Sequence, residues 1–273
     1  MGGMLSTKQC SWGKGRMGLL TGKRALVIGV LDHHSICWGI AQSLAREGAE
    51  LCLTYQNERL RPGVEEAASA FPGTITLPLD LQNDEQIDDV RDTLAERWGK
   101  LDILVEGAAF AKREELDGEF IKVSRDGFKL AMEISAYSLV AATRACRGLM
   151  AAAGGGSVLT LTYIGSERVI TNYNVMGVAK AALEACVRYL ANDLGPENIR
   201  VNAISSGPIR TVAASGVRGV GGMIGQLAER TPLRRKADRD QVGDAAAFLS
   251  SDLARGITGE ILYVDNGYHI MGA

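Results

Sequence analysis

Seven short apolar runs alternate with amphipathic stretches along this chain, and this alternation constrains its fold more than any other feature. The runs predict strands at residues 24–30, 50–55, 74–79, 102–106, 156–163, 199–205 and 260–264. Helical patterns lie between them at residues 36–47, 84–98, 125–150, 174–193 and 239–250. Short connections between strands and helices indicate right-handed crossovers. The sequence therefore predicts one doubly wound α/β domain with about seven parallel strands and helices on both faces.

Composition excludes several classes of protein. The net charge of −2 gives no general attraction to nucleic acid or to an anionic membrane. No apolar run approaches the roughly 18 residues that a membrane span needs, so we expect no membrane-spanning helix. Five scattered cysteines without a CxxC pair indicate core residues in a reducing compartment, and we expect a cytoplasmic protein. His33 and His34 lack a third ligand at metal-binding spacing, so no metal site is expected.

The turn after the first predicted strand has features of a phosphate-binding loop. In doubly wound sheets, ligands bind outside the carboxyl ends of the strands. Gly29 would let the backbone approach a pyrophosphate, and Ser35 would cap the next helix and donate to phosphate. The segment is not the GxGxxG fingerprint, so an ordinary strand–turn–helix is an equally good interpretation.

The ends of the second and third strands carry candidate ribose and adenine contacts. Gln56 stands where an acidic residue usually binds the ribose of NAD, and the nearby Arg59 and Arg61 leave NADP open. Asp80 and Leu81 follow the third strand. They are placed either to bind and cover an adenine ring or simply to begin a turn.

Three residues after the fifth strand point to hydride-transfer chemistry. Tyr163 ends that strand, and Tyr173 and Lys180 follow it. Seven residues of helix make about two turns, so Tyr173 and Lys180 are expected on one face. A buried lysine lowers the pKa of a neighbouring phenol and binds ribose hydroxyls, and such a phenol donates to an oxyanion. A solvated lysine beside an edge aromatic is commoner, but the position at the crevice favours catalysis.

The chain divides most simply into a tail and one domain. Folding signals begin only near Met17, so residues 1–18 are predicted to be a flexible N-terminal extension. Residues 19–273 form the predicted dinucleotide-binding catalytic domain. Within it, residues 212–230 are rich in glycine and small residues, which is typical of a mobile lid over a substrate or of a poorly packed surface helix.

Taken together, these motifs resemble the NADH-dependent enoyl-acyl-carrier-protein reductases, a divergent branch of the short-chain dehydrogenases with a Rossmann-type fold. The resemblance extends from about Leu19 to Gly267. The matching segments are Gly29…Ser35-Ile36…Gly39-Ile-Ala, Thr54-Tyr-Gln56-Asn, Tyr173-Asn-Val-Met-Gly…Ala-Lys180 and Asn202-Ala-Ile-Ser…Gly-Pro-Ile209-Arg-Thr211. The resemblance implies a homotetramer that uses NAD(H) to reduce the trans-2 double bond of an enoyl thioester in fatty-acid synthesis.

The resemblance also implies a role for each site residue. Tyr173 would stabilise or protonate the enolate oxygen, Lys180 would hold the nicotinamide ribose, and Tyr163 would line the thioester pocket. The implied cofactor contacts are Gly29, Ser35, Ile36, Gln56, Asp80, Leu81, Gly107, Lys180, Ile209 and Thr211.

Three segments depart from the family pattern, and one of them, residues 1–18, has no counterpart in the family. Residues 107–109 read Gly-Ala-Ala, where the family has Ser-Ile-Gly or Ser-Ile-Ala after its fourth strand, and the preceding Glu106 is an unexpected charge near the cofactor. The family's lid often carries basic residues that meet the acidic carrier protein. Here Arg218 remains, but Gly221 and Gly222 replace others, so acyl-carrier protein and coenzyme A both stay open as the acyl handle.

Two other functions remain alternatives. An ordinary short-chain carbonyl reductase has a tyrosine four residues before its lysine, and Met176 holds that place before Lys180. A catalytically weak NAD-binding paralogue is the second alternative, supported by Glu106 and the glycine-rich lid.

Overall fold

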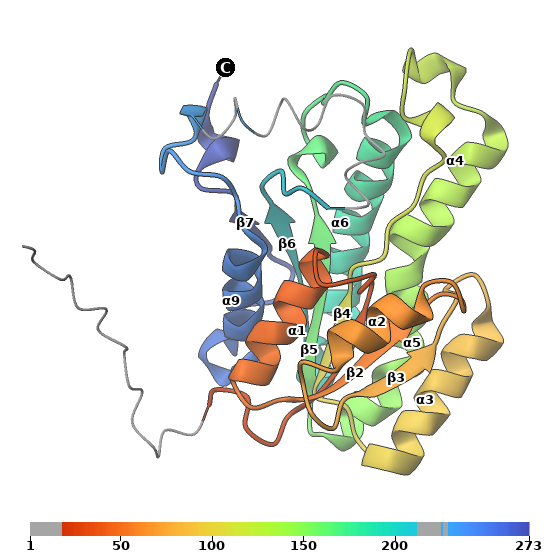
Figure 1. Ribbon diagram of the computed structural model, residues 1–273, viewed down its shortest axis with the longest axis vertical. Helices are drawn as coiled ribbons and strands as arrows, with labels where there is room; N and C mark the ends of the chain where they lie inside the picture. Colours follow the sequence, from red (N-terminus) through yellow and green to blue (C-terminus); the bar gives the residue numbers. More distant parts are fainter. Residues whose placement is uncertain (1–17, 212–224, 226–228, 273) are drawn as a thin grey trace, which may run out of the picture.

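The structure is a computed structural model that describes residues 18–211, 225 and 229–272. In this part of the chain, seven parallel strands form one sheet in the order β3-β2-β1-β4-β5-β6-β7. Helices cover both of its faces (Figure 1), so the predicted doubly wound α/β domain is confirmed. The strands are β1 (Arg24–Ile28), β2 (Glu50–Tyr55), β3 (Ile75–Pro78), β4 (Ile103–Glu106), β5 (Gly156–Thr162), β6 (Ile199–Ser206) and β7 (Ile261–Val264).

The helices follow the predicted positions with two differences. The structure adds α2, which the sequence did not predict. It begins with Arg61 and Pro62, and proline is tolerated in the first turn of a helix. The predicted helix at residues 125–150 is divided by a π-helical turn, Glu133–Tyr137. The helices are α1 (Ile36–Arg46), α2 (Arg61–Ala68), α3 (Asp84–Trp98), α4 (Arg125–Met132), α5 (Ser138–Ala152), α6 (Asn174–Leu194) and α9 (Arg239–Ser250).

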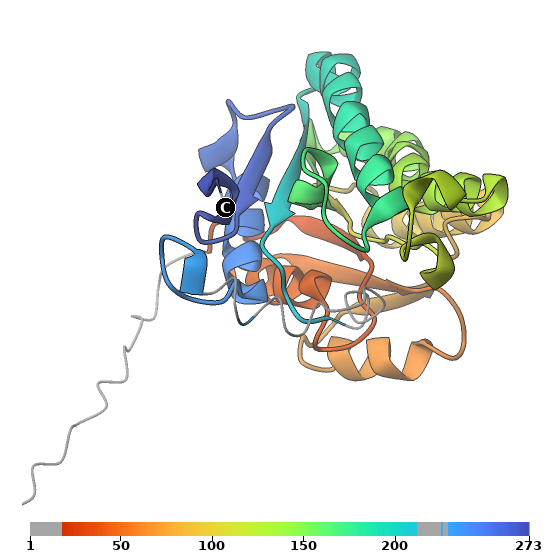
Figure 2. The same ribbon diagram turned by 90° about the horizontal axis from the view of Figure 1, so that it is seen from above.

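Each face of the sheet has its own apolar core, because successive side chains of a strand point to opposite faces. On β1, Ala25 and Val27 pack in a core with α1, α2 and α9, whereas Leu26 and Ile28 pack in a core with α3, α5 and α6. Figure 2 shows these two helical layers on opposite sides of the sheet. Strands buried in this way on both faces explain the nearly continuous apolar runs of the sequence.

The boundaries of α3 follow from local chemistry. The side chain of Asn83 accepts hydrogen bonds from the backbone N–H groups of Glu85 (2.9 Å) and Gln86 (3.4 Å), which have no partner within the helix. Gly99 ends the helix in a left-handed conformation, with φ of +69°. These two capping residues therefore fix the start and the end of the helix that connects β3 to β4.

Several sequence-based expectations fall on residues outside the described part. These are most of the predicted N-terminal extension, residues 1–17, and most of the predicted lid, residues 212–224 and 226–228. Among the helices that are described, none is long and apolar enough to cross a membrane. The described residues also contain no group of three or more His, Cys, Asp or Glu side chains arranged to hold a metal ion.

Candidate active site

The absence of two side chains brings the backbones at the ends of β1 and β4 close together. Gly29 has φ of +105°, and a Cβ there would stand 2.9 Å from the carbonyl carbon of Gly107. A Cβ on Gly107 would collide with the Sγ atom of Cys37. The strand order reverses between β1 and β4, which is where doubly wound sheets bind dinucleotides. Gly29 and Gly107 therefore let β1, β4 and α1 pack closely at the edge where such a sheet binds a dinucleotide.

The N-terminus of α1 faces the same edge of the sheet. Ser35 occupies the N-cap position, but its hydroxyl donates a 2.7 Å hydrogen bond to the carbonyl of Asp32 and makes no capping bond. The prediction that the Ser35 side chain caps the helix is therefore wrong. The first N–H groups of a helix have no partner within it and lie at the positive end of its dipole. Beginning at Ile36, these groups suit an anion such as a pyrophosphate.

Gln56 lies exposed directly after β2, at the position predicted for ribose contact. Of the two arginines that left NADP open, Arg61 is already paired with acids. Arg61 donates to Glu65 at 2.8 Å and to Glu58 at 3.4 Å, and its guanidinium lies 5.7 Å from the ring centre of Tyr55. These two carboxylates compete with a 2′-phosphate for the guanidinium.

The remaining predicted cofactor contacts follow β3 and β6. Asp80 and Leu81 are half-buried after β3, and Asp80 begins a turn in which its Oδ1 atom accepts a 3.1 Å bond from the N–H of Gln82. Ile209 and Thr211 are half-buried after β6, and Ile209 packs against the core that contains α1. All four residues therefore lie at the carboxyl edge, as predicted.

Two phenol rings lie together after β5. Tyr163 directly follows the strand, and Tyr173 is the N-cap residue of α6. Their ring centres are 5.2 Å apart, and the planes meet at 72° in an edge-to-face arrangement. Sequence spacing predicted both residues at this edge but did not predict that their rings touch.

The protonation of these phenols differs from the sequence-based expectation. Burial raises the pKa of Tyr163 to about 12, with a smaller contribution from Tyr268. Burial also raises the pKa of Tyr173, and the neighbouring Tyr163 and Glu184 raise it further. The prediction that Lys180 lowers the pKa of Tyr173 is therefore wrong, because burial and acidic neighbours dominate its surroundings. At neutral pH both phenols are protonated.

Lys180 is buried on α6 rather than solvated. Its Nζ atom donates a 2.7 Å hydrogen bond to the carbonyl of Leu161 on β5. Burial lowers the pKa of Lys180, while the charges of Glu106, Cys37 and Glu184 oppose that decrease. The catalytic hypothesis required a buried lysine, and the structure confirms that Lys180 is buried.

Sequence reasoning missed Glu184, which lies in the same buried cluster. Its carboxylate accepts a 2.6 Å hydrogen bond from the hydroxyl of Thr162, the last residue of β5. The signal was available, because Glu184 follows Lys180 by four residues and such residues lie on one face of a helix.

Glu106 is the last residue of β4 and is fully buried. Its Oε1 atom accepts a 2.9 Å bond from the N–H of Ala108, and its Oε2 atom accepts a 3.3 Å bond from the hydroxyl of Thr160. Burial raises the pKa of Glu106 to about 7, although the charge of Lys180 and hydrogen bonds from neighbouring groups oppose that increase. The structure thus places this unexpected acid at the carboxyl end of β4, where the charge of Lys180 acts on it.

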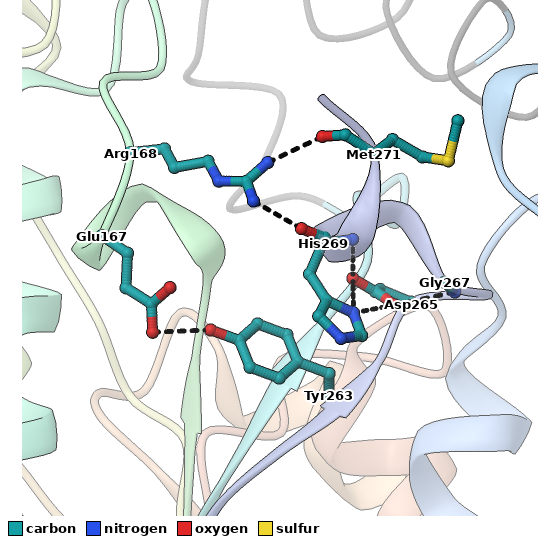
Figure 3. Close-up of polar contacts among 7 residues, drawn as sticks. All are labelled: Glu167, Arg168, Tyr263, Asp265, Gly267, His269 and Met271. Atoms are coloured by element: carbon teal, nitrogen blue, oxygen red, sulfur yellow. Dashed lines mark hydrogen bonds and ion pairs between the residues drawn. The ribbon is translucent and has the colours of Figure 1, made fainter. Parts of the chain in front are cut away.

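The loop between β5 and α6 is braced by the C-terminal segment of the chain (Figure 3). Arg168 donates to the carbonyl oxygens of His269 at 2.6 Å and of Met271 at 2.9 Å. Tyr263, on β7, donates a 2.7 Å hydrogen bond to Glu167, and its ring stacks on that of His269 at 4.1 Å. The loop that connects the two phenols is therefore anchored to residues about a hundred positions further along the chain.

A doubly wound parallel sheet with a helix N-terminus at its switch point, and with tyrosines and a buried lysine after β5, defines a dinucleotide-dependent oxidoreductase of the short-chain dehydrogenase class. Within that class, the family described as enoyl-(acyl carrier protein) reductase matches residues 29–269. The chain therefore belongs to the enoyl-acyl-carrier-protein reductase family.

Individual relatives agree with this assignment. The chain is 52% identical to the enoyl-[acyl-carrier-protein] reductase [NADH] FabI of Bacillus cereus, over 94% of this chain and all of that protein. It is 50% identical to the FabI enzyme of Escherichia coli, over 93% of this chain and 97% of that protein.

Solved structures share the fold closely. The Bacillus cereus reductase, solved with NADP+ and indole naphthyridinone, matches with a TM-score of 0.92 and 52% identity, over 94% of this chain and all of that one. The reductase of Anaplasma phagocytophilum, solved with NAD, matches with a TM-score of 0.90 and 44% identity, over 94% of this chain and 98% of that one.

Proposed function

We propose that this chain uses NADH to reduce the trans-2 double bond of an enoyl thioester in fatty-acid synthesis. The observation that carries the proposal is the edge-to-face pair of Tyr163 and Tyr173 at the carboxyl edge of the sheet, on the same side as the buried Lys180. Relatives at about half identity that are named NADH-dependent enoyl-acyl-carrier-protein reductases support it.

NADH supplies the hydride when it is bound. The backbone at Gly29 and the N-terminus of α1 would hold its pyrophosphate. Because Arg61 is engaged by two glutamates, we propose NADH rather than NADPH as the preferred cofactor. The proposed cofactor-binding residues are Gly29, Ser35, Ile36, Gln56, Asp80, Leu81, Gly107, Lys180, Ile209 and Thr211.

The raised pKa of Tyr173 decides how that residue would act. A phenol that stays protonated stabilises a developing enolate oxygen by donating a hydrogen bond, and it can then transfer its proton. Tyr163, edge-on to it, would line the thioester pocket and hold the ring in place. Lys180 would bind the ribose hydroxyls, since its ammonium already donates to the carbonyl of Leu161 at this edge.

The test is NADH oxidation followed by absorbance with a short trans-2-enoyl thioester and, separately, with a β-ketoacyl thioester. We expect oxidation with the enoyl compound alone. Oxidation with the β-ketoacyl compound alone would identify an ordinary carbonyl reductase, and tight NADH binding with no turnover would identify a non-catalytic paralogue. Repeating the enoyl assay with the acyl group on acyl-carrier protein and then on coenzyme A shows which of the two carriers the enzyme accepts.

The quaternary structure and the location are also proposals. Apolar or aromatic side chains lie exposed on α4, the π-helical turn and α6, which supports a homotetramer. They are Phe128, Tyr137, Val178 and Tyr189. The described cysteines are unpaired, which supports a reducing compartment such as the cytoplasm. Light scattering and cell fractionation test these two proposals.

A further inference from the structure

A buried carboxylate requires compensation, because taking its charge out of water is costly unless partners replace the solvent. Glu106 has 1% of its surface exposed. Its Oε1 atom accepts a hydrogen bond from the Ala108 N–H, and its Oε2 atom accepts one from the Thr160 hydroxyl. Both of these donors are neutral, so they compensate the negative charge only in part.

A positive charge that acts on Glu106 is that of Lys180, which is also buried. Glu106 is bonded to the side chain of Thr160, and Lys180 is bonded to the carbonyl of Leu161. Thr160 and Leu161 are consecutive residues of β5, so both charges are anchored to adjacent positions of the same strand. Among the groups that raise the pKa of Lys180, Glu106 has the largest effect.

Other titratable groups face the same cluster from α1 and α6. Cys37, on α1, is buried, and burial raises its thiol pKa to about 12, so it carries no charge near neutral pH. Glu184, on α6, accepts the hydroxyl proton of Thr162 and also favours a charged Lys180, but more weakly than Glu106 does. Glu184 therefore provides a matched control carboxylate on the same lysine.

We propose that Glu106 is a positioning residue whose buried carboxylate keeps Lys180 protonated, so that its ammonium stays bonded to the carbonyl of Leu161 near the carboxyl end of β5. The family resemblance did not lead us to expect a charged residue at position 106. The inference rests on the proposed function only for what the ammonium then binds.

The direct test follows the titration of the Lys180 ammonium by NMR in the full chain, with lysine labelled by ¹⁵N and the signal assigned through Lys180→Arg. In Glu106→Gln we expect the acid dissociation constant of Lys180 to rise at least about tenfold, one pH unit. Glu106→Asp should retain most of the wild-type value, and Glu184→Gln should move it less than Glu106→Gln does. An unchanged Lys180 titration in Glu106→Gln would overturn the proposal.

If Glu106→Gln does not fold, the wild-type protein still provides a test. The Lys180 signal should then shift in step with the titration of the Glu106 carboxyl, which ¹³C-labelled glutamate reports separately. A Lys180 signal that does not change as the Glu106 carboxyl titrates would overturn the proposal.

NADH affinity separates this inference from the proposed function. In Glu106→Gln, the affinity should begin to fall at a lower pH than in the wild type, because Lys180 loses its proton earlier. A merely structural role would weaken NADH binding by the same factor at every pH, which would contradict positioning. Wild-type affinity in Lys180→Met would instead refute the ribose role of Lys180 and leave the NMR result standing.

Discussion

Tyr163 and Tyr173 meet edge to face with their ring centres 5.2 Å apart, one following β5 and the other preceding α6. Burial disfavours ionisation of both phenols, and Tyr163 further disfavours ionisation of Tyr173. Two neutral phenols at one edge are two hydrogen-bond donors, and a substrate oxygen that gains negative charge would meet a donor without having to wait for proton exchange.

We expect Tyr173→Phe to lower kcat by about 100-fold or more while the Kd for NADH changes little. The hydroxyl acts on charge that develops in the transition state, whereas it contributes little to binding of the reduced cofactor. Steady-state kinetics and NADH fluorescence measure the two quantities. The exposed Tyr189→Phe on α6 is the control. Equal turnover in the Tyr173 variant would remove its catalytic role.

Gly107→Ala should destabilise the chain by roughly 1–3 kcal/mol, since the added methyl group collides with the sulfur atom of Cys37. Cys37→Ala in the same chain should recover much of that loss. Urea unfolding of the two single variants and the double variant measures the coupling.

Gly148→Ala is the control for this prediction, because a Cβ at that position of α5 meets no atom within 4 Å. Its stability should stay equal or increase, as alanine is the better helix former. If Gly107→Ala is as stable as Gly148→Ala, the close approach between β4 and α1 is not tight.

Folding raises the pKa of Glu106 from its ordinary 4.5 to about 7, and this makes stability depend on pH. The contribution of this carboxyl is fully present below about pH 4.5 and is lost as pH rises through about 7. The unfolding free energy of the wild type relative to Glu106→Gln should therefore fall by roughly 3 kcal/mol across that window. Urea unfolding at several pH values checks this, and a difference independent of pH would contradict it.

Arg168→Ala should release the C-terminal segment, because it removes the donor to two of its backbone carbonyls. Amide hydrogen exchange in residues 268–272 should rise, and kcat should fall severalfold as the loop between the phenols loosens. Arg168→Lys, which can satisfy one carbonyl, should have an intermediate effect. Faster exchange with unchanged kcat would show that the brace does not serve the site.

Periodicity and spacing determined much of this protein by themselves. Runs such as that of β1 are apolar on both faces, so they predict buried parallel strands without any knowledge of their neighbours. The order of strands and helices then places Gly29, Tyr163 and Lys180 at one edge, because the carboxyl ends of parallel strands meet there. These features were predictable because each depends on local sequence or on chain order alone.

Tertiary structure decided what no local pattern contains. That Tyr173 is protonated rather than activated by Lys180, that Glu106 shares its surroundings with that lysine, and that Arg168 reaches the C-terminal segment all depend on register and packing. Charges and rings far apart in the chain act on one another through space. Their effect is set by burial and by distances that exist only once the sheet and its two helical layers have assembled.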